Sequence, residues 1–370
     1  MVKVLFLIHD LGQGGAEKVL VNLVNNMDRT KFDITVIALF GGGVNEQFLR
    51  PEIKYRSIFS RMFPGNSHIM KIFSPELLHR WFIKEEYDIE ISYLEGPSAR
   101  IISGCKSNAK LISWIHVEQH SIKKLAFAFK SDKEAIKCYN RFDQTICVSE
   151  FVKNDFCGIL NYKGNATVLY NTIESEKVRT LGQEKEELLL DDGRIRLVAV
   201  GTLKESKGYG RLLKITQKLL SENYPVHLYI LGEGSMRTDI EQSIKTNNMD
   251  DAVTLLGYQM NPYKFVKNCD LFVCASFAEG FSTAVTESLI LGTPVCTVEV
   301  SGMRELLGNN NEYGIVTEND EEALYKGIKS LLDNQQLLEY YRQQARYRGN
   351  KFETRSTVVA VEEMLLSLIK

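Results

Sequence analysis

The 370-residue sequence has no long apolar run, and this argues against a membrane-spanning helix. Such a helix needs about 18 to 20 consecutive apolar residues, and no stretch of the chain approaches that length. The first segment, MVKVLFLIHDLGQGG, holds only a short apolar run and no small-residue cleavage site. We therefore expect a buried first strand there and not a signal peptide.

The cysteines form no C-x-x-C pair, and their number, seven, is odd. Most of them lie inside apolar runs such as LFVCAS. Disulfide frameworks and zinc sites both need cysteines in matched spacings. The pattern instead predicts buried thiols in a reducing compartment, with no metal cluster, and hence a cytoplasmic protein.

The sequence also lacks a complete dinucleotide-binding motif. Two segments begin the pattern G-x-G-x-x-G, but Glu17 and Arg237 stand where the third glycine belongs. The expected second strand ends in ALFGGG and offers no acid for a ribose. Nicotinamide and flavin chemistry are therefore disfavoured.

Neither sign of charge is in large excess, because the net charge is −2. A protein that binds nucleic acid usually has an excess of positive charge, so nucleic acid is not an expected partner. The two halves nevertheless differ. Residues 1–170 hold 22 lysines and arginines against 18 acids, whereas the remainder holds 23 against 29. An acidic or anionic partner would therefore meet the first half more favourably.

Short β-branched runs alternate with amphipathic stretches along most of the chain, which is typical of parallel sheets covered on both faces. The expected strands are 2–8, 32–40, 53–59, 87–94, 110–116, 143–149, 166–170, 195–201, 226–232, 252–257, 269–276 and 294–298. The polar stretch 173–192 interrupts the pattern and is the expected linker. We predict an α/β protein with Rossmann-like domains at 1–172 and 193–354. A final helix at about 355–370 is expected to pack back near the first domain.

The segment FAEGFSTAVTESLILGTPV (277–295) has the strongest functional pattern. A buried strand should end near Ser276, and Ser282 or Thr283 should cap a helix that stops at Gly292. Glu279 then lies in the loop and Glu287 about one turn inside the helix. Carboxylates accept hydrogen bonds from sugar hydroxyls, and a helix start binds phosphate. A nucleoside diphosphate sugar fits this layout, although Glu287 could also serve only to stabilise the first helical turn.

The stretch EGFSTAVTE resembles the E-x7-E motif of the family 4 retaining glycosyltransferases. Further segments match this family in the expected order. GQGGAEKVL resembles its N-terminal glycine loop, SWIHVE its histidine-bearing loop, VGTLKESKG the segment of its basic pair, and LGEG and LGTPV two later segments. The resemblance covers nearly the whole chain. It implies the GT-B fold, in which two Rossmann-like domains face each other across a cleft.

The family's roles are carried over onto matching positions of this sequence. Glu287 would bind the ribose, Glu279 the donor sugar and Lys207 the diphosphate, while His116 would lie beside the donor sugar. The implied catalytic residues are His116, Lys207 and Glu279; the implied donor-binding residues are Gly14, Gly15, Thr202, Gly234, Tyr258, Gly280, Phe281, Ser282, Thr283 and Glu287. From the residues alone, the glycines could be simple tight turns, and His116 a rim residue with His120 as a competitor.

One position departs from the family pattern, because Thr202 stands where the arginine of the basic pair is usual. Arg211, Arg237 or Arg304 could replace that arginine, or phosphate binding is weaker. An inactive partner subunit therefore stays open as an alternative. A sugar-nucleotide epimerase or a phosphorylase-like enzyme with the same fold is also open.

The expected reaction moves a sugar from a nucleotide donor, most simply a UDP-sugar, to a hydroxyl of a glycan or a polyprenyl-diphosphate-linked saccharide. No metal-ligand spacing and no D-x-D motif occur, so we expect neither a metal nor another cofactor. The basic segment 121–141 holds six lysines and arginines with Leu125, Phe127 and Phe129 between them. It is either a solvated helix face or a peripheral contact with the inner face of the cell membrane.

Overall fold

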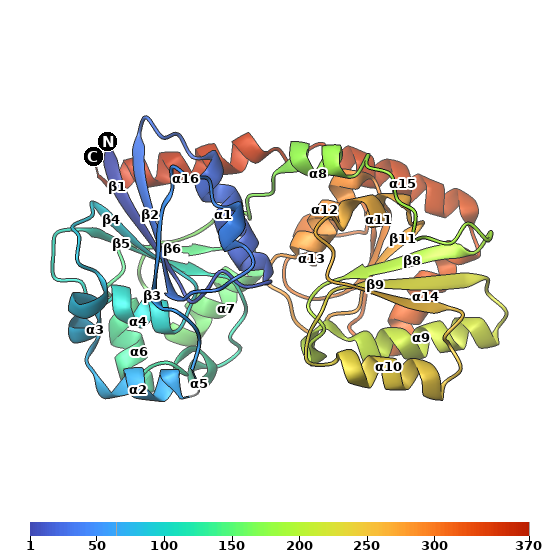
Figure 1. Cartoon of the computed structure of the whole chain (residues 1–370), viewed down its shortest axis with the longest axis horizontal. Coiled ribbons are helices and arrows are strands. Elements are labelled where there is room, and N and C mark those ends of the chain that lie inside the picture. Colours follow the sequence, from blue (N-terminus) through green and yellow to red (C-terminus); the bar gives the residue numbers. More distant parts are fainter. Residues whose placement is uncertain (64, 370) are drawn as a thin grey trace. The chain divides into compact units, whose positions relative to one another are not determined.

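The computed structural model describes residues 1–63 and 65–369, and of Ser67 and His68 only the main chain. The chain divides into two compact units. The first comprises Met1–Thr172 and Thr354–Lys370, and the second Ile173–Glu353. Each unit is a parallel sheet with helices on both faces (Figure 1).

The first unit is built on a seven-stranded parallel sheet in the order β3-β2-β1-β4-β5-β6-β7. Its strands are β1 (Val2–Ile8), β2 (Phe32–Phe40), β3 (Lys54–Phe59), β4 (Ile89–Tyr93), β5 (Lys110–Ile115), β6 (Gln144–Cys147) and β7 (Ala166–Val168). In the centre, Val4 pairs with Ile34 on one side and with Ile89 on the other. These side chains are fully buried, as expected for a sheet covered on both faces.

Helices α1 and α16 cover one face of this sheet, and α4 and α6 the other (Figure 1). The helices are α1 (Gly15–Asn26), α2 (Asn66–Ile72), α3 (Pro75–Phe82), α4 (Pro97–Ile102), α5 (Ile122–Leu125), α6 (Asp132–Tyr139), α7 (Glu150–Leu160) and α16 (Thr354–Leu368). Serine hydroxyls at positions 74, 121, 131 and 149 cap α3, α5, α6 and α7. Each cap satisfies a main-chain N–H that the helix itself cannot pair.

The second unit is built on a six-stranded parallel sheet in the order β10-β9-β8-β11-β12-β13. Its strands are β8 (Ile195–Val200), β9 (Val226–Leu231), β10 (Val253–Gly257), β11 (Leu271–Cys274), β12 (Val295–Val298) and β13 (Ile315–Thr317). Its helices are α8 (Ser175–Leu181), α9 (Tyr209–Ser221), α10 (Arg237–Thr246), α11 (Tyr263–Asn268), α12 (Thr283–Leu291), α13 (Met303–Leu307), α14 (Glu321–Leu332) and α15 (Gln335–Gly349). One core cluster joins α9, α10 and α14 to the sheet.

The segment 173–192, expected as a linker, belongs instead to the second unit. Its helix α8 packs against α11 and α12, and Asn261 donates a hydrogen bond to the Leu181 carbonyl at 2.9 Å. The high charge of this segment hid the buried Val178, which anchors the helix.

Helix α16 at the end of the chain belongs to the first unit, where it contacts α1. Its Glu362 is 2% exposed and accepts a hydrogen bond from the Asp28 main-chain N–H at 2.7 Å. The expected range of this helix extends to residue 370, which lies outside the described residues.

Each sheet has a point where the direction of strand order reverses. It lies beside β1 and β4 in the first unit, and beside β8 and β11 in the second. In open parallel sheets, ligands bind outside the carboxyl ends of the strands at such a point. The loops after these strands are therefore where a site should be sought in each unit.

Candidate functional site

The predicted donor-binding residues of the second unit gather at the carboxyl edge of its sheet. Thr202 and Lys207 follow β8, Gly234 follows β9, Tyr258 follows β10 and Glu279 follows β11. Because these four strands are neighbours in the order β10-β9-β8-β11, their loops lie along one stretch of that edge. Positions up to 77 residues apart in the sequence are thereby brought together.

Lys207 and Glu279 form an ion pair at the centre of this group. The Lys207 Nζ lies 2.6 Å from the Glu279 Oε1, and the Ser276 hydroxyl donates to the same oxygen at 2.6 Å. Burial alone would lower the pKa of Lys207, but the Glu279 carboxylate more than offsets this, so the pKa is raised. Lys207 is therefore a fixed positive charge at neutral pH.

Helix α12 begins directly beside this pair. The Ser282 hydroxyl caps the helix by accepting from the Val285 N–H, and Gly292 ends it in the left-handed conformation. Both features were predicted. Phe281 and Ser282 are buried, while Thr283 is half-buried and Gly280 precedes them in the same turn. A start of this kind presents main-chain N–H groups and the positive end of the helix dipole to an anion.

Glu287 lies inside α12 and is 6% exposed, as its apolar neighbours predicted. The Tyr263 hydroxyl from α11 donates to its Oε1 at 3.2 Å. Its carboxylate is thus held by a second helix as well as by its own. Tyr258, by contrast, is 41% exposed at the end of β10, so its ring is accessible to a ligand.

All three arginines proposed to replace the missing basic residue are engaged by other groups. Arg211 donates to the carbonyls of Ala275 and Ser276 and to Asn319. Its guanidinium thus supports the strand end that leads to Glu279.

The other two arginines are paired with carboxylates. Arg237 forms ion pairs with Glu233 and Glu241, and Arg304 pairs with Glu299. Within the VGTLKESKG segment, Lys207 is consequently the cation that faces Glu279. The second member of the usual basic pair is missing, because position 202 holds threonine and not arginine.

Two glycines of this edge are required by packing. A Cβ on Gly234 would lie 2.4 Å from the Leu203 carbonyl oxygen, and one on Gly208 would lie 2.0 Å from that of Ala275. Gly208 also has φ +68°, a conformation that favours glycine. The tight turns therefore explain why glycine stands at both positions, whether or not a phosphate binds there.

In the first unit, the predicted residues follow β1 and β5. Gly14 is the N-cap of α1 and Gly15 its first residue. A Cβ on Gly14 would lie 2.0 Å from a carboxylate oxygen of Glu17, so the Glu17 side chain folds back over this glycine. His116 follows β5, which is separated from β1 only by β4.

His116 is 5% exposed and lies against the Tyr93 ring, with the ring centroids 4.7 Å apart. Burial lowers its pKa to about 3, so the imidazole is neutral at physiological pH. Its buried Nε2 makes no hydrogen bond within the described part of the chain. His120, the competing histidine, has a 60% exposed side chain.

The loop that carries His116 is held by two acids that the sequence did not single out. Glu95 accepts hydrogen bonds from the main-chain N–H groups of His116 and Val117 and from the Gln119 side chain, at 3.2, 3.1 and 2.9 Å. Asp155 of α7 accepts from the main-chain N–H of Gln119 at 2.6 Å. Burial raises the pKa of Glu95. These acids fix the position of the imidazole.

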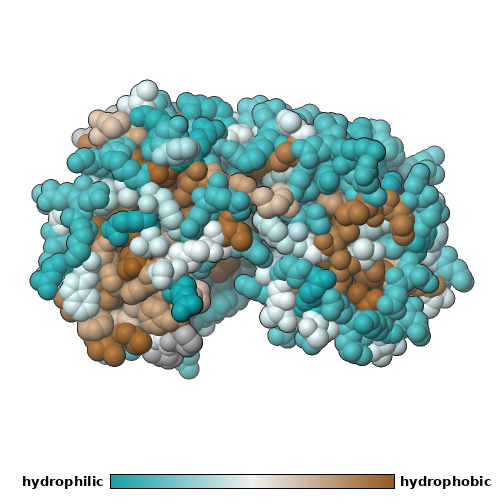
Figure 2. All heavy atoms as spheres, viewed as in Figure 1, coloured by the Kyte–Doolittle hydropathy of each residue, from teal (hydrophilic) through white to brown (hydrophobic). Residues whose placement is uncertain are grey.

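The basic segment 121–141 is only partly what its sequence suggests. Its lysines at 123, 124, 130, 133 and 137 are exposed. Leu125 and Phe129, however, are 0% and 2% exposed and belong to the core. Phe127 is 51% exposed, and the nearby Ile72 of α2 is 69% exposed. Apolar side chains gather over the region of α2 and α3 on the face in Figure 2.

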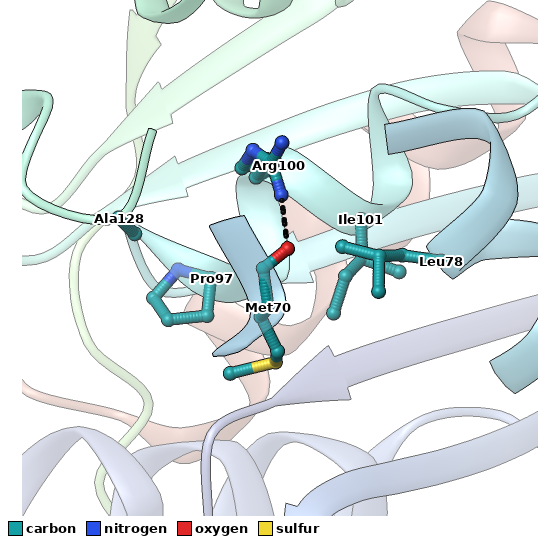
Figure 3. Close-up of a pocket in the computed structure, with 6 residues that line it drawn as sticks. All are labelled: Met70, Leu78, Pro97, Arg100, Ile101 and Ala128. Carbon is teal, nitrogen blue, oxygen red and sulfur yellow. Dashed lines mark hydrogen bonds between the residues drawn. The ribbon is translucent and has the colours of Figure 1, made fainter. Parts of the chain in front are cut away.

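A small pocket of about 10 Å³ lies beneath α2, with room for about one water molecule. It is lined by Met70, Leu78, Pro97, Arg100, Ile101 and Ala128 (Figure 3). Arg100 is 1% exposed and donates to the carbonyls of Met70 and Phe73 and to Glu134. Its role is to tie α2 to α4 and α6.

Two family models match consecutive parts of the chain. The model described as Glycosyltransferase Family 4 matches residues 13–177, and that described as Glycosyl transferases group 1 matches residues 182–348. The chain belongs to the family 4, group 1 glycosyltransferases. The resemblance inferred from EGFSTAVTE and its accompanying segments is thereby confirmed.

Two curated relatives come from Campylobacter jejuni. One, N-acetylgalactosamine-N,N'-diacetylbacillosaminyl-diphospho-undecaprenol 4-alpha-N-acetylgalactosaminyltransferase, is 35% identical over 189 residues. This match spans 50% of the chain and 49% of the relative. The other, a GalNAc-alpha-(1->4)-GalNAc-alpha-(1->3)-diNAcBac-PP-undecaprenol alpha-1,4-N-acetyl-D-galactosaminyltransferase, is 25% identical over 386 residues, 100% of the chain and 98% of the relative.

The GT-B fold expected from the sequence is also confirmed by solved structures. Anabaena Alr3699/HepE in complex with UDP matches with a TM-score of 0.76 at 18% identity, covering 99% of this chain and 100% of that one. Sucrose-phosphate synthase from Thermosynechococcus elongatus matches with a TM-score of 0.79 at 15% identity, covering 99% of both chains. At this identity the likeness concerns the fold alone. No helix in the described residues is long and apolar enough to cross a membrane.

Proposed function

We propose that this glycosyltransferase is a retaining hexosyltransferase with a UDP-sugar donor. The acceptor is a hydroxyl of a glycan or of a polyprenyl-diphosphate-linked saccharide, in the synthesis of a cell-surface polysaccharide or glycolipid. The observation that carries the proposal is the Lys207–Glu279 pair beside the start of α12. Lipid-linked acceptors are named for both Campylobacter relatives, and UDP is bound in a protein of the same fold.

The Lys207–Glu279 pair and the start of α12 bind different parts of the donor. Glu279 accepts hydrogen bonds from the sugar hydroxyls, whereas Lys207 and the N–H groups of residues 280–283 bind the diphosphate. Glu287 accepts from the ribose, and the exposed Tyr258 lies against the base. In the free protein, Glu279 compensates the charge of Lys207. In the complex, the diphosphate replaces Glu279 as the partner of Lys207, and the sugar hydroxyls replace Lys207 as the partners of Glu279.

The chemistry follows from charge placement. Both glutamates have binding roles, so neither supplies the nucleophile of a double displacement. The acceptor hydroxyl attacks the anomeric carbon from the side of the departing diphosphate, a donor phosphate oxygen takes its proton, and the sugar–phosphate bond breaks. Lys207 and the N–H groups of α12 stabilise the negative charge of the leaving UDP. These groups supply that charge stabilisation without a metal ion.

The first test is thermal unfolding with UDP, GDP, ADP and TDP, each with and without magnesium. A nucleotide at 100 times its Kd stabilises the native state by about 2.7 kcal/mol, which raises the unfolding temperature by several degrees. We expect UDP, and none of the other three nucleotides, to raise the unfolding temperature, and we expect it to do so without magnesium. A larger shift with another nucleotide would contradict the assigned base, and a shift that requires magnesium would contradict the metal-independent mechanism.

The alternative of an inactive partner subunit is favoured by one observation, namely Thr202 together with the engagement of Arg211, Arg237 and Arg304 by other groups. It predicts that no nucleotide shifts the unfolding temperature. The same experiment therefore decides between the two functions.

We further propose that the first unit contacts anionic lipid through its basic segment. Lys130 donates to the Ile72 carbonyl at 3.1 Å, which places the exposed Ile72 and the lysines of this segment on one surface. Each lysine near an anionic membrane contributes about 1 kcal/mol. We expect charge reversal of Lys123, Lys133 and Lys137 to weaken binding to phosphatidylglycerol vesicles at least about 100-fold in a flotation assay.

The matched control reverses three exposed lysines of the second unit, Lys214, Lys245 and Lys326. It removes the same net charge and should leave vesicle binding within about threefold of the unaltered protein, because these lysines lie outside the proposed surface. Equal losses in both variants would show that only net charge matters. Binding that survives the first set of reversals would contradict a membrane contact through this segment.

A further inference from the structure

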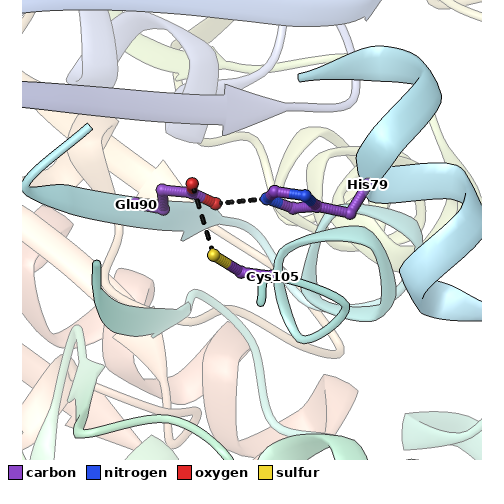
Figure 4. A group of neighbouring side chains, drawn as sticks. All are labelled: His79, Glu90 and Cys105. Carbon is purple, nitrogen blue, oxygen red and sulfur yellow. Dashed lines mark hydrogen bonds and ion pairs between the residues drawn. The ribbon is translucent and has the colours of Figure 1, made fainter. Parts of the chain in front are cut away.

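A buried group of three metal-ligating side chains lies outside the site described above. It comprises His79 of α3, Glu90 of β4 and Cys105, which follows α4 (Figure 4). Their ligand atoms all lie within 4.8 Å of one another. The side chains of His79 and Glu90 are 14% and 2% exposed, and Cys105 is 1% exposed. The geometry points to a structural site for a divalent cation of the zinc class.

The distances among the three groups suit such an ion. In a tetrahedral zinc site, bond lengths of about 2.0–2.3 Å place a sulfur and an oxygen ligand about 3.6 Å apart, and a nitrogen and an oxygen about 3.4 Å apart. The Cys105 Sγ lies 3.5 Å from the Glu90 Oε1, so this pair has the required separation. The His79 Nε2 lies 2.7 Å from the Glu90 Oε2 in a hydrogen bond. That contact must open by about 0.7 Å to admit the ion, while the His79 nitrogen and the Cys105 sulfur already lie within 4.8 Å of each other.

The chemistry of the three ligands selects the ion. A thiolate with an imidazole and a carboxylate favours zinc over magnesium or calcium, which prefer oxygen ligands. A neutral imidazole, a thiolate and a carboxylate together carry two negative charges, so a bound Zn²⁺ leaves this buried site neutral. Charge neutrality matters here because an uncompensated buried charge is strongly unfavourable.

The ligands are held in place by neighbouring groups. Arg141 donates to the carbonyls of Ser103 and Cys105, which fixes the loop that carries the thiol. Glu90 lies on a strand that is paired on both sides, opposite Leu5 of β1 and Leu111 of β5. The 14% exposure of the His79 side chain leaves a path by which an ion and one water ligand could enter.

The position of the group indicates a structural and not a catalytic role. Glu90 is the second residue of β4, near the amino end of the strand. The residues proposed for transfer follow the carboxyl ends of their strands. An ion here would join α3, β4 and the loop after α4, and would stabilise the first unit without contacting the reaction.

The test uses the full chain, first stripped with a chelator and then given Zn²⁺ or Co²⁺ alone. We expect one equivalent of zinc to be retained after dialysis and the unfolding temperature to rise. Co²⁺ should give the near-ultraviolet charge-transfer band of a cobalt–thiolate bond. The Cys105→Ser variant, which keeps the His79–Glu90 hydrogen bond, should lose that band and the retained zinc.

The matched control is Cys157→Ser, a half-buried cysteine of α7 in the same unit. It should retain zinc and the cobalt band. Absence of retained zinc in the unaltered protein, or a cobalt band that persists in Cys105→Ser, would overturn the proposal. The stripped protein should still respond to UDP, so failure of the metal site and failure of the proposed function give different results.

Discussion

Replacing Lys207 by alanine should lower kcat/KM for sugar transfer by about 10³-fold, and most of the loss should be in kcat. Removal of one preorganised group that stabilises developing negative charge costs about 10²- to 10³-fold. The upper end is expected here because Thr202 supplies no second charge and the three candidate arginines are paired elsewhere. Steady-state kinetics with the UDP-sugar identified by the nucleotide screen measure the effect.

The control is Lys204→Ala, which removes an exposed lysine three positions earlier in the same loop. It should leave kcat/KM within about threefold of the unaltered enzyme, because surface charges away from a site contribute little. If Lys207→Ala kept its turnover within the same range, the proposed role of the lysine at the diphosphate would be wrong.

A double-mutant cycle that combines Lys207→Ala with Glu279→Gln separates the effect on catalysis from the effect on stability. Lys207→Ala leaves the Glu279 carboxylate without its ion-pair partner, so Glu279→Gln should recover part of the lost free energy of unfolding. The two residues contact different parts of the donor in the proposed complex, so turnover should fall further in the double variant. Recovery of turnover together with stability would mean that the pair is only structural.

The strands were predictable from the sequence because β-branched apolar runs give a strong local signal. The expected strands 2–8 and 32–40 coincide with β1 and β2 to the residue. β13 was missed because it has only three residues in the segment YGIVTEND. The segment 173–192 was wrongly predicted to be a linker. Its many charged residues indicate that one face of α8 contacts solvent, but they give no information about the face that packs.

The candidate site was only partly predictable, because motifs identify residues and not their partners. Glu279 was found from its place in the loop before a capped helix and Lys207 through the family resemblance, but their ion pair joins positions 72 residues apart. Glu95 gave no signal, since a single acid in YLEGP resembles any loop acid. The group of His79, Glu90 and Cys105 has no regular spacing, because the three residues come from different elements that meet only in the folded sheet.

Replacing Glu95 by alanine should lower kcat/KM by about 10²-fold without direct contact with either substrate. The carboxylate accepts three hydrogen bonds from the loop of residues 116–119, two of them from main-chain N–H groups. Each donor left unpaired in a buried loop costs about 1–3 kcal/mol, so the loop will move to satisfy them. A displacement of about 1 Å at a reacting centre is enough for a 10²-fold loss. Because the His116 Nε2 makes no hydrogen bond within the described residues, the imidazole depends for its position on its loop and on the Tyr93 ring.

Three measurements distinguish this positioning role from a general loss of stability. Glu118→Ala is the control in the same loop, since its carboxylate accepts no hydrogen bond within the described part of the chain, and it should stay near unaltered activity. Glu95→Gln keeps one acceptor oxygen and should recover part of the activity. The shift produced by UDP should persist in Glu95→Ala, because the proposed nucleotide site lies in the second unit. A lost UDP shift would mean that Glu95 supports the fold as a whole, whereas full activity would show that the His116 loop holds its position through Asp155 alone.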